Sequence, residues 1–264
     1  MKKTLRQLTT AALFAAASLA HASEFKELRI ATEAGYPPFE YIAPSGDLQG
    51  FNIDIGNEIC KRLEAKCVWI DQSFDGLIPG LQARKFDLAN STMTATDARR
   101  KVIDFSVPMY VVASRLVAHK DKALEPTVES LKGRRVAVQQ GTTMESYARK
   151  EWAPHGVQVI SYPSYTNAFT DLAAGRVDAS FQEAPNAVDG FLQKPEGADF
   201  ALTGGTVKDS AILNEPIAIG IRKGNKKLKA AVDQTIQAML EDGTIQSFSE
   251  KYFEPNTIEL PSSH

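Results

Sequence analysis

Residues 86–100 read FDLANSTMTATDARR and contain one complete change from strand to helix. The first four residues form a short apolar run, which is typical of a buried strand. Thr96 followed by Asp97 is typical of a helix start, because a threonine hydroxyl caps free N–H groups and an acid suits the positive end of the helix dipole. Asn90 to Ala95 therefore lie on a loop at the carboxyl edge of a predicted sheet.

The same change recurs along most of the chain. Strands are predicted at 28–32, 68–70, 86–89, 135–139, 157–162 and 177–181, and helices at 53–63, 77–83, 144–152, 165–173, 226–240 and 247–252. Such alternation predicts an α/β fold with parallel sheets covered by helices.

Two further extended runs, 114–118 and 217–221, suggest two lobes rather than one sheet. A chain that crosses to a second lobe and returns needs two linkers and leaves a cleft between the lobes. Ligands of open α/β sheets bind beyond the carboxyl ends of the strands, near helix N-termini. We therefore expect a ligand in this cleft.

Residues 1–22 have the features of a secretory signal peptide: a basic start, an Ala-rich apolar run and small residues before the cleavage site. The run is shorter than the roughly 20 residues that a membrane anchor needs. We expect cleavage after Ala22 and export as a soluble protein, and the resemblance described below implies the periplasm.

Cys60 and Cys67 are the only cysteines, and seven residues apart at a predicted helix-to-strand turn they can reach each other. In an exported protein a disulfide is the expected state, and so short a loop contributes about 2–3 kcal/mol. A metal site needs more ligands, and the four histidines are scattered, so we expect no metal.

Charge and motifs exclude several functions. The formal net charge is -2, and it is more negative without the basic signal residues, which argues against nucleic acid and suits cationic small molecules. The chain has no G-x-S-x-G elbow, P-loop or H-E-x-x-H motif. No general base lies near the hydroxyls of the opening stretch, so we expect neither catalysis nor a cofactor.

Arg99 is the strongest candidate for binding an anion. It lies in the first turn of a predicted helix, where free N–H groups favour anions, and its guanidinium can hold a carboxylate through two parallel hydrogen bonds. Ser91, Thr92 and Thr94 precede it on the loop. The alternative is a capped helix with a surface arginine. A similar loop, Gly141 to Thr143, follows the predicted strand at 135–139 and offers donors from the second lobe.

Acidic and aromatic residues near strand ends are candidates for binding a cation. Glu33 and Tyr36 lie on a loop stiffened by Pro37-Pro38, and an acid beside a ring suits a cationic group. Phe74 offers a second ring, and Glu183 follows a strand and can pair with an ammonium group. The alternatives are a surface carboxylate, core aromatics and an acid at a helix start.

In combination, several segments resemble the periplasmic solute-binding proteins of polar amino acid ABC transporters (solute-binding protein family 3), especially the lysine/arginine/ornithine, histidine and octopine/nopaline branch. The resemblance covers about residues 27–253. It is carried by ATEAGYPPFEY (31–41), GFNIDIGNEICKRLEAKC (50–67), FDGLIPGLQARKFD (74–87), the opening stretch, PTVESLKGRRVAVQQGTT (126–143) and EDGTIQSFSEKYF (241–253).

The resemblance implies a two-lobed periplasmic binding protein fold (type II) with two hinge strands and the ligand in the interlobe cleft. Lobe 1 would comprise 23–111 and 217–264, lobe 2 would comprise 112–216, and the hinges would lie near 111–113 and 212–218. The implied protein is a monomer that delivers its ligand to an inner-membrane ABC permease.

The family pattern also implies roles for the residues around the ligand backbone. Arg99 resembles the clamp for the α-carboxylate, helped by Thr94 and the Thr143 backbone. Thr92 and Glu183 resemble the partners of the α-ammonium group, although the family usually carries Asp in place of Glu183.

Other positions resemble the family's contacts to the ligand side chain. Glu33 and Ser91 resemble side-chain readers, and Tyr36 and Phe74 flank the aliphatic stem. The cysteine pair matches the disulfide of this branch.

Four further departures concern the pocket: Asn52 for the usual acid, Gln139 for an apolar residue, Met144 for a polar contact, and the additional amide of Asn90. They affect the ligand rather than the fold. We expect arginine, ornithine, lysine or histidine, with an opine as the alternative. A periplasmic enzyme similar to cyclohexadienyl dehydratase, with a pocket carboxylate as general acid, is the third possibility.

Overall fold

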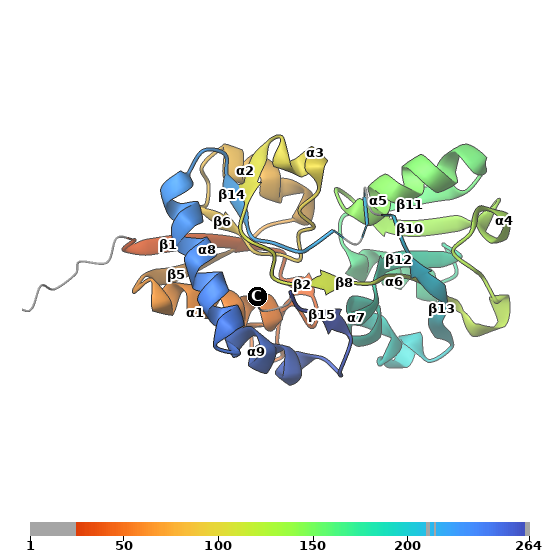
Figure 1. Ribbon diagram of the computed structural model, residues 1–264. Coiled ribbons are helices and arrows are strands. Elements are labelled where there is room, and N and C mark those ends of the chain that lie inside the picture. Colours follow the sequence, from red (N-terminus) through yellow and green to blue (C-terminus); the bar gives the residue numbers. More distant parts are fainter. Residues whose placement is uncertain (1–24, 210–211, 214, 262–264) are drawn as a thin grey trace, which may run out of the picture.

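The computed structural model describes residues 25–209, 212–213 and 215–261. The expected signal peptide lies outside these residues. Two groups of strands and helices lie side by side, with β8 and β15 between them (Figure 1). Each group contains one five-stranded sheet. We call these groups the first lobe and the second lobe, and they confirm the expected two-lobed α/β fold.

The sheet of the first lobe has the order β5-β1-β6-β14-β7. Its strands are Glu27–Thr32 (β1), Lys66–Asp71 (β5), Leu88–Ala89 (β6), Ile103–Phe105 (β7) and Gly220–Arg222 (β14). β1 runs parallel to β5 and β6, whereas β14 runs antiparallel to β6 and β7. A small sheet, Gly35–Tyr36 (β2), Glu40–Ile42 (β3) and Leu48–Gln49 (β4), follows β1.

The sheet of the second lobe has the order β11-β10-β12-β9-β13. Its strands are Ser114–His119 (β9), Arg135–Gln139 (β10), Gln158–Tyr162 (β11), Ala179–Glu183 (β12) and Phe200–Val207 (β13). β10 is parallel to β11 and β12, and β9 is antiparallel to β12 and β13.

The expectation of wholly parallel sheets is therefore wrong at β9 and β14, which run opposite to the other strands of their sheets. Parallel neighbours are joined by a crossover, usually a helix. β9 and β14 instead enter their sheets directly after the chain has crossed from the other lobe, so no crossover helix sets their direction.

Helices cover both faces of the first sheet. Phe51–Arg62 (α1), Lys226–Glu241 (α8) and Thr244–Tyr252 (α9) pack together, while Leu77–Gln82 (α2) packs on β6, β7 and β14. Successive strand residues point to opposite faces, and Ile30 and Ala31 accordingly belong to two separate core clusters. Ile30 and Ala31 are neighbours in sequence and both apolar, as a strand that is buried on both faces requires.

The remaining helices are short and belong mostly to the second lobe. They are Asp97–Arg100 (α3, first lobe), Val128–Leu131 (α4), Thr143–Tyr147 (α5), Tyr165–Ala173 (α6) and Ala184–Ala187 (α7). The predicted helix at 144–152 is α5 continued by a π-helix at Ala148–Trp152.

Two segments connect the lobes. Val111–Val112 (β8) pairs with Ile258–Glu259 (β15), and Ile217 forms isolated bridges with Thr94 and Tyr110. The chain thus first crosses between the lobes as strand β8. The segment that returns contains Ile217, which forms single bridges with Tyr110, just before β8, and with Thr94.

Cys60 and Cys67 form the expected disulfide, with Cα atoms 5.7 Å apart, which joins the end of α1 to the start of β5. In the part of the chain that the structure describes, no helix is long and apolar enough to cross a membrane.

Candidate ligand-binding site

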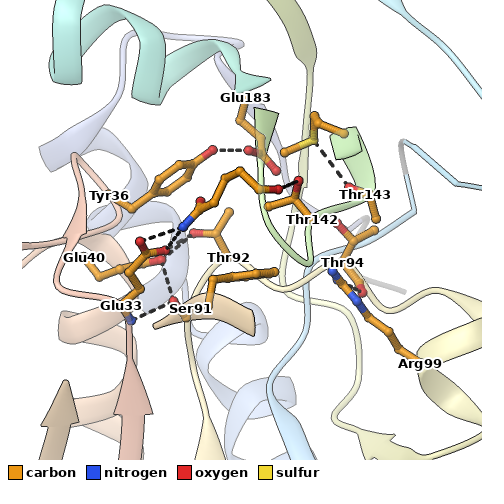
Figure 2. Close-up of a pocket in the computed structure, with 13 residues that line it drawn as sticks. Glu33, Tyr36, Glu40, Ser91, Thr92, Thr94, Arg99, Thr142, Thr143 and Glu183 are labelled. Atoms are coloured by element: carbon orange, nitrogen blue, oxygen red, sulfur yellow. Dashed lines mark hydrogen bonds between the residues drawn. The ribbon is translucent and has the colours of Figure 1, made fainter. Parts of the chain in front are cut away.

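A pocket with about 290 Å³ of empty space lies between the lobes (Figure 2). All nine predicted site residues line it: Glu33, Tyr36, Phe74, Ser91, Thr92, Thr94, Arg99, Thr143 and Glu183. The structure thus brings together groups that lie at or after the ends of β1, β5, β6, β10 and β12, as expected for strand ends that face one cleft.

Arg99 is positioned by the turn between β6 and α3. Thr96 caps α3, accepting a hydrogen bond from the Arg99 backbone at 3.3 Å. The guanidinium donates to the carbonyl of Thr94 and to that of Gly141 in the second lobe, both at 2.8 Å. It also lies over the Phe74 ring, 5.4 Å from its centroid. Burial lowers the pKa of Arg99 to about 10, so the group remains cationic at neutral pH.

The facing turn, between β10 and α5, is built in the same way. Thr142 caps α5, accepting from the Glu145 backbone at 3.1 Å, and Glu145 Oε2 accepts from the Gly141 N–H at 2.8 Å. Thr143 is the first residue of α5, so its backbone N–H has no partner within the helix.

Gly141 brings this turn close to the first lobe. Its φ is +76°, and a Cβ atom added to it would lie 3.2 Å from the Asp75 Cα. A side chain here would be strained by its backbone conformation and crowded by Asp75. Glycine therefore allows the Gly141 carbonyl to reach Arg99.

Glu33 closes one end of the pocket together with Gln139. The carboxylate is 8% exposed, and Gln139 Nε2 donates to both of its oxygens at 2.7 Å from the second lobe. Burial raises the pKa of Glu33 to about 7, although the Gln139 hydrogen bond acts in the opposite direction.

Glu183 ends β12 and precedes α7. It is 4% exposed and accepts a hydrogen bond from the Tyr36 hydroxyl of the first lobe. Burial raises the pKa of Glu183 to about 7, against the lowering effects of the Tyr36 hydrogen bond and the Arg99 charge. Two carboxyl groups in the pocket thus have a raised affinity for protons that a bound cation would replace.

Four lining residues were not among the predicted contacts: Glu40, Gln139, Thr142 and Met144. Gln139 had a visible signal, because it is a polar residue at the end of a buried strand. Thr142 was expected only as part of the donor loop Gly141 to Thr143, and Met144 only as a departure from the family. Met144 is 2% exposed and accepts weak contacts from the hydroxyls of Ser114 and Thr143 through its sulfur.

Glu40 is the missed residue with the strongest chemical character. It is 1% exposed and forms no salt bridge in the described residues, yet it accepts from Asn52 Nδ2 at 2.7 Å and from the hydroxyls of Ser91 and Thr92 at 3.1 Å. Burial raises the pKa of Glu40 well above its usual range, and the hydrogen bonds from Asn52, Thr92 and Ser91 oppose this rise. An acid in the mostly apolar run PPFEY was the available signal.

The two asparagines noted in the sequence support the pocket from behind. Asn90 donates to the Asn52 carbonyl at 2.6 Å and does not line the pocket. The Asn52 side chain lies between Glu40, Thr92 and the Tyr110 hydroxyl. Within the residues described, no group of three or more His, Cys, Asp or Glu side chains could hold a metal ion.

Comparison with known proteins gives consistent relatives. Residues 28–255 match the model of the bacterial extracellular solute-binding proteins, family 3. The lysine/arginine/ornithine-binding periplasmic protein of Escherichia coli (strain K12) is 40% identical over 256 residues, covering 97% of this chain and 98% of the relative. The histidine-binding periplasmic protein of the same strain is 39% identical over 254 residues, covering 96% and 98%.

Solved structures agree with these relatives. An ancestral arginine-binding protein bound to arginine superposes with a TM-score of 0.80 at 34% identity, covering 86% of this chain and 98% of that one. The ancestral amino acid-binding protein AncCDT-1, a precursor of cyclohexadienyl dehydratase, has a TM-score of 0.77 at 32% identity, covering 86% and 96%. The resemblance seen in the sequence is confirmed, and the chain belongs to the bacterial extracellular solute-binding proteins, family 3.

Proposed function

We propose that this protein is the periplasmic component of an ABC importer, which captures a basic L-amino acid by lobe closure and delivers it to the inner-membrane permease. Relatives named for binding lysine, arginine, ornithine or histidine support this function. So does a neighbouring structure bound to arginine.

The observation that carries the proposal is the charge of the pocket. Three buried carboxyl groups, Glu33, Glu40 and Glu183, line it together with one cation, Arg99. A charge taken out of water must meet a partner. A ligand with one carboxylate and two cationic groups matches Arg99, Glu33 and Glu183, while Glu40 is held by hydrogen bonds from its neighbours. An acidic ligand would place like charges together.

The proposed contacts place the ligand backbone between the lobes. Arg99 binds the α-carboxylate with help from Thr94 and the Thr143 N–H. Thr92 and Glu183 bind the α-ammonium group.

The side chain of the ligand points toward the other end of the pocket. Glu33 and Ser91 bind its cationic group, and Tyr36 and Phe74 flank its aliphatic part. We also propose 23–111 with 217–264 as one lobe and 112–216 as the other, hinged near 111–113 and 212–218. A monomeric state and the lack of nucleic-acid binding stay predictions.

A thermal-shift screen over amino acids and opines tests the function. A ligand at 100 times its dissociation constant should raise the free energy of unfolding by about 2.7 kcal/mol. We expect arginine, ornithine, lysine or histidine to give the largest shift. A screen that favours glutamate or glutamine would contradict the cationic ligand, and a screen that favours octopine or nopaline would replace the free amino acid with its opine.

The relation to AncCDT-1 leaves one enzymatic alternative to test. Glu183 would then be the general acid, since its pKa of about 7 suits proton donation near neutral pH. We propose that the protein binds without catalysis. Incubation with prephenate or arogenate should give no aromatic product, and formation of one would show an enzyme.

A further inference from the structure

The neighbours of the Thr92 hydroxyl determine the direction in which its proton points. A threonine hydroxyl has one proton to donate and two lone pairs to accept. Asn52 Nδ2 donates to Thr92 Oγ1 at 3.0 Å, and Glu40 offers carboxylate oxygens at 3.1 and 3.3 Å. The hydrogen bonds from Asn52, Thr92 and Ser91 favour the ionised form of Glu40, against the effect of its burial on the pKa, and an ionised Glu40 has no proton to give, so the Thr92 proton points to Glu40. The Tyr110 hydroxyl also lies within hydrogen-bonding reach of Thr92, but it donates its proton to Asn52 Oδ1, so one lone pair of Thr92 remains available.

Ser91 has the same arrangement with different partners. Its Oγ accepts from the backbone N–H of Glu33 at 3.0 Å and donates to Glu40 Oε1 at 3.1 Å. Again the single proton is used on Glu40, and one lone pair remains.

From these contacts we propose that Glu40 is a positioning residue that fixes both hydroxyl protons, so that Ser91 and Thr92 face the ligand only as hydrogen-bond acceptors. The hydroxyl oxygens of Ser91 and Thr92 would then bind N–H groups of a cation and reject a ligand that offers a hydrogen-bond acceptor at the same place. The proposal deepens the proposed function and rests on it, because it explains how the site selects cationic ligands.

The surrounding structure holds this arrangement in place. Asn52 keeps its amide oriented because its Oδ1 accepts from the Tyr110 hydroxyl at 3.1 Å. An acid at position 52 has at most one proton and could not donate to both Glu40 and Thr92, so asparagine suits an ionised Glu40. Thr92 has a φ of +41°, which is unfavourable for a β-branched residue. Its two buried hydrogen-bond partners help to hold it there.

Arginine and citrulline form a matched pair of probes. They have the same length and the same backbone groups, but citrulline is neutral and carries a carbonyl oxygen where arginine carries an N–H group. Calorimetry at pH 8 should therefore show that the protein prefers L-arginine.

Glu40→Gln is the decisive variant. Asn52 Nδ2 donates to the Oε2 position and so holds the new amide oxygen there, which places the new NH2 group at the Oε1 position, where it must donate to both hydroxyls and frees their protons toward the ligand. We expect the ratio of the citrulline and arginine dissociation constants to fall about tenfold, as for loss of a hydrogen bond to a charged group. Glu129→Gln makes the same chemical change on an exposed helix of the second lobe and should leave the ratio unchanged.

A double-mutant cycle separates positioning from general support. In a Ser91→Ala background, Glu40→Gln should change the ratio little, because its route to the ligand side chain is gone. Equal weakening of both ligands by Glu40→Gln, or the same change of ratio with and without Ser91, would overturn the proposal.

A joint neutron and X-ray structure of the deuterated wild-type protein at pH 8 requires no variant. Deuterons of Ser91 and Thr92 should lie on the Glu40 side, with none on Glu40. A deuteron on Glu40, or hydroxyl deuterons directed into the pocket, would refute the assignment even if Glu40→Gln did not fold. Failure of the proposed function is a separate result, namely a wild-type protein that binds none of the four basic amino acids.

Discussion

The two turns that face each other across the pocket share a threonine cap and differ in the use of the residue three positions after it. Each begins with a threonine cap, Thr96 or Thr142, and each carries its functional side chain three residues later. In the second lobe this residue is Glu145, which reaches back to its own turn and satisfies the Gly141 N–H. In the first lobe it is Arg99, which donates to the Thr94 carbonyl of its own turn and also reaches Gly141 in the other lobe.

The difference shows that Glu145 stabilises its own helix start, whereas Arg99 is available for binding. Threonine followed three residues later by glutamate is a capping box, in which both side chains stabilise the start of their own helix. Arginine at the same position cannot accept a hydrogen bond from the backbone N–H groups there. When the residue three positions after a helix cap cannot stabilise the helix start, its side chain is available for binding, and such departures from the usual pattern are expected at functional sites.

Arg99→Ala should have the largest effect on this comparison. We expect L-arginine affinity to fall about 100-fold, because removing one partner of a buried charge pair costs roughly 2–5 kcal/mol. Arg100→Ala is the matched control, since the neighbouring Arg100 donates to the Ala95 carbonyl and lies over Phe105, outside the pocket. Unchanged calorimetric binding by Arg99→Ala would show that the two turns do not differ in function.

The pH dependence of binding should be smaller and should come from the carboxylate end of the pocket. Glu33 and Glu183 have pKa values of about 7 without a ligand, whereas that of Arg99 is about 10. Below pH 7 a cationic ligand must displace their protons, so affinity for L-arginine should rise about tenfold for each such group between pH 6 and pH 8. Calorimetry in buffers of different ionisation enthalpy should detect proton release at pH 7. A flat profile would mean that neither carboxyl group pairs with the ligand.

Glu145→Ala should have the smallest effect and acts on the second turn alone. It removes the contact to the Gly141 N–H and the ion pair with Arg149, which should lower the free energy of unfolding by about 1 kcal/mol. Affinity for L-arginine should change by no more than about threefold, since a residue that serves its own turn touches no ligand. A loss of affinity as large as that of Arg99→Ala would remove the distinction between the turns.

Local patterns predicted most of the fold, and non-local contacts account for the rest. Strand β10 and helix α6 have the predicted limits, because apolar periodicity and the capping residue Ser164 specify them within a few residues. The antiparallel direction of β9 and β14 depends on how the chain crosses between lobes, which no short stretch encodes.

The candidate site shows the same division. Arg99 and the hydroxyl residues before it were predicted because they lie between a recognisable strand end and a recognisable helix start. Glu40 was missed, because its role depends on Asn52, Ser91 and Thr92, which are between 12 and 52 residues away in sequence. A buried acid whose partners come from distant segments leaves no periodic or spaced signal.

The bridging guanidinium of Arg99 links ligand release to the motion of the lobes. Its two carbonyl partners, Thr94 and Gly141, belong to different lobes, so separation of the lobes removes one partner from the group proposed to hold the ligand carboxylate. Water can then reach the guanidinium and compete for it. The residence time of a bound amino acid should therefore equal the lifetime of the closed form. The rate of lobe opening would then limit the rate of ligand release.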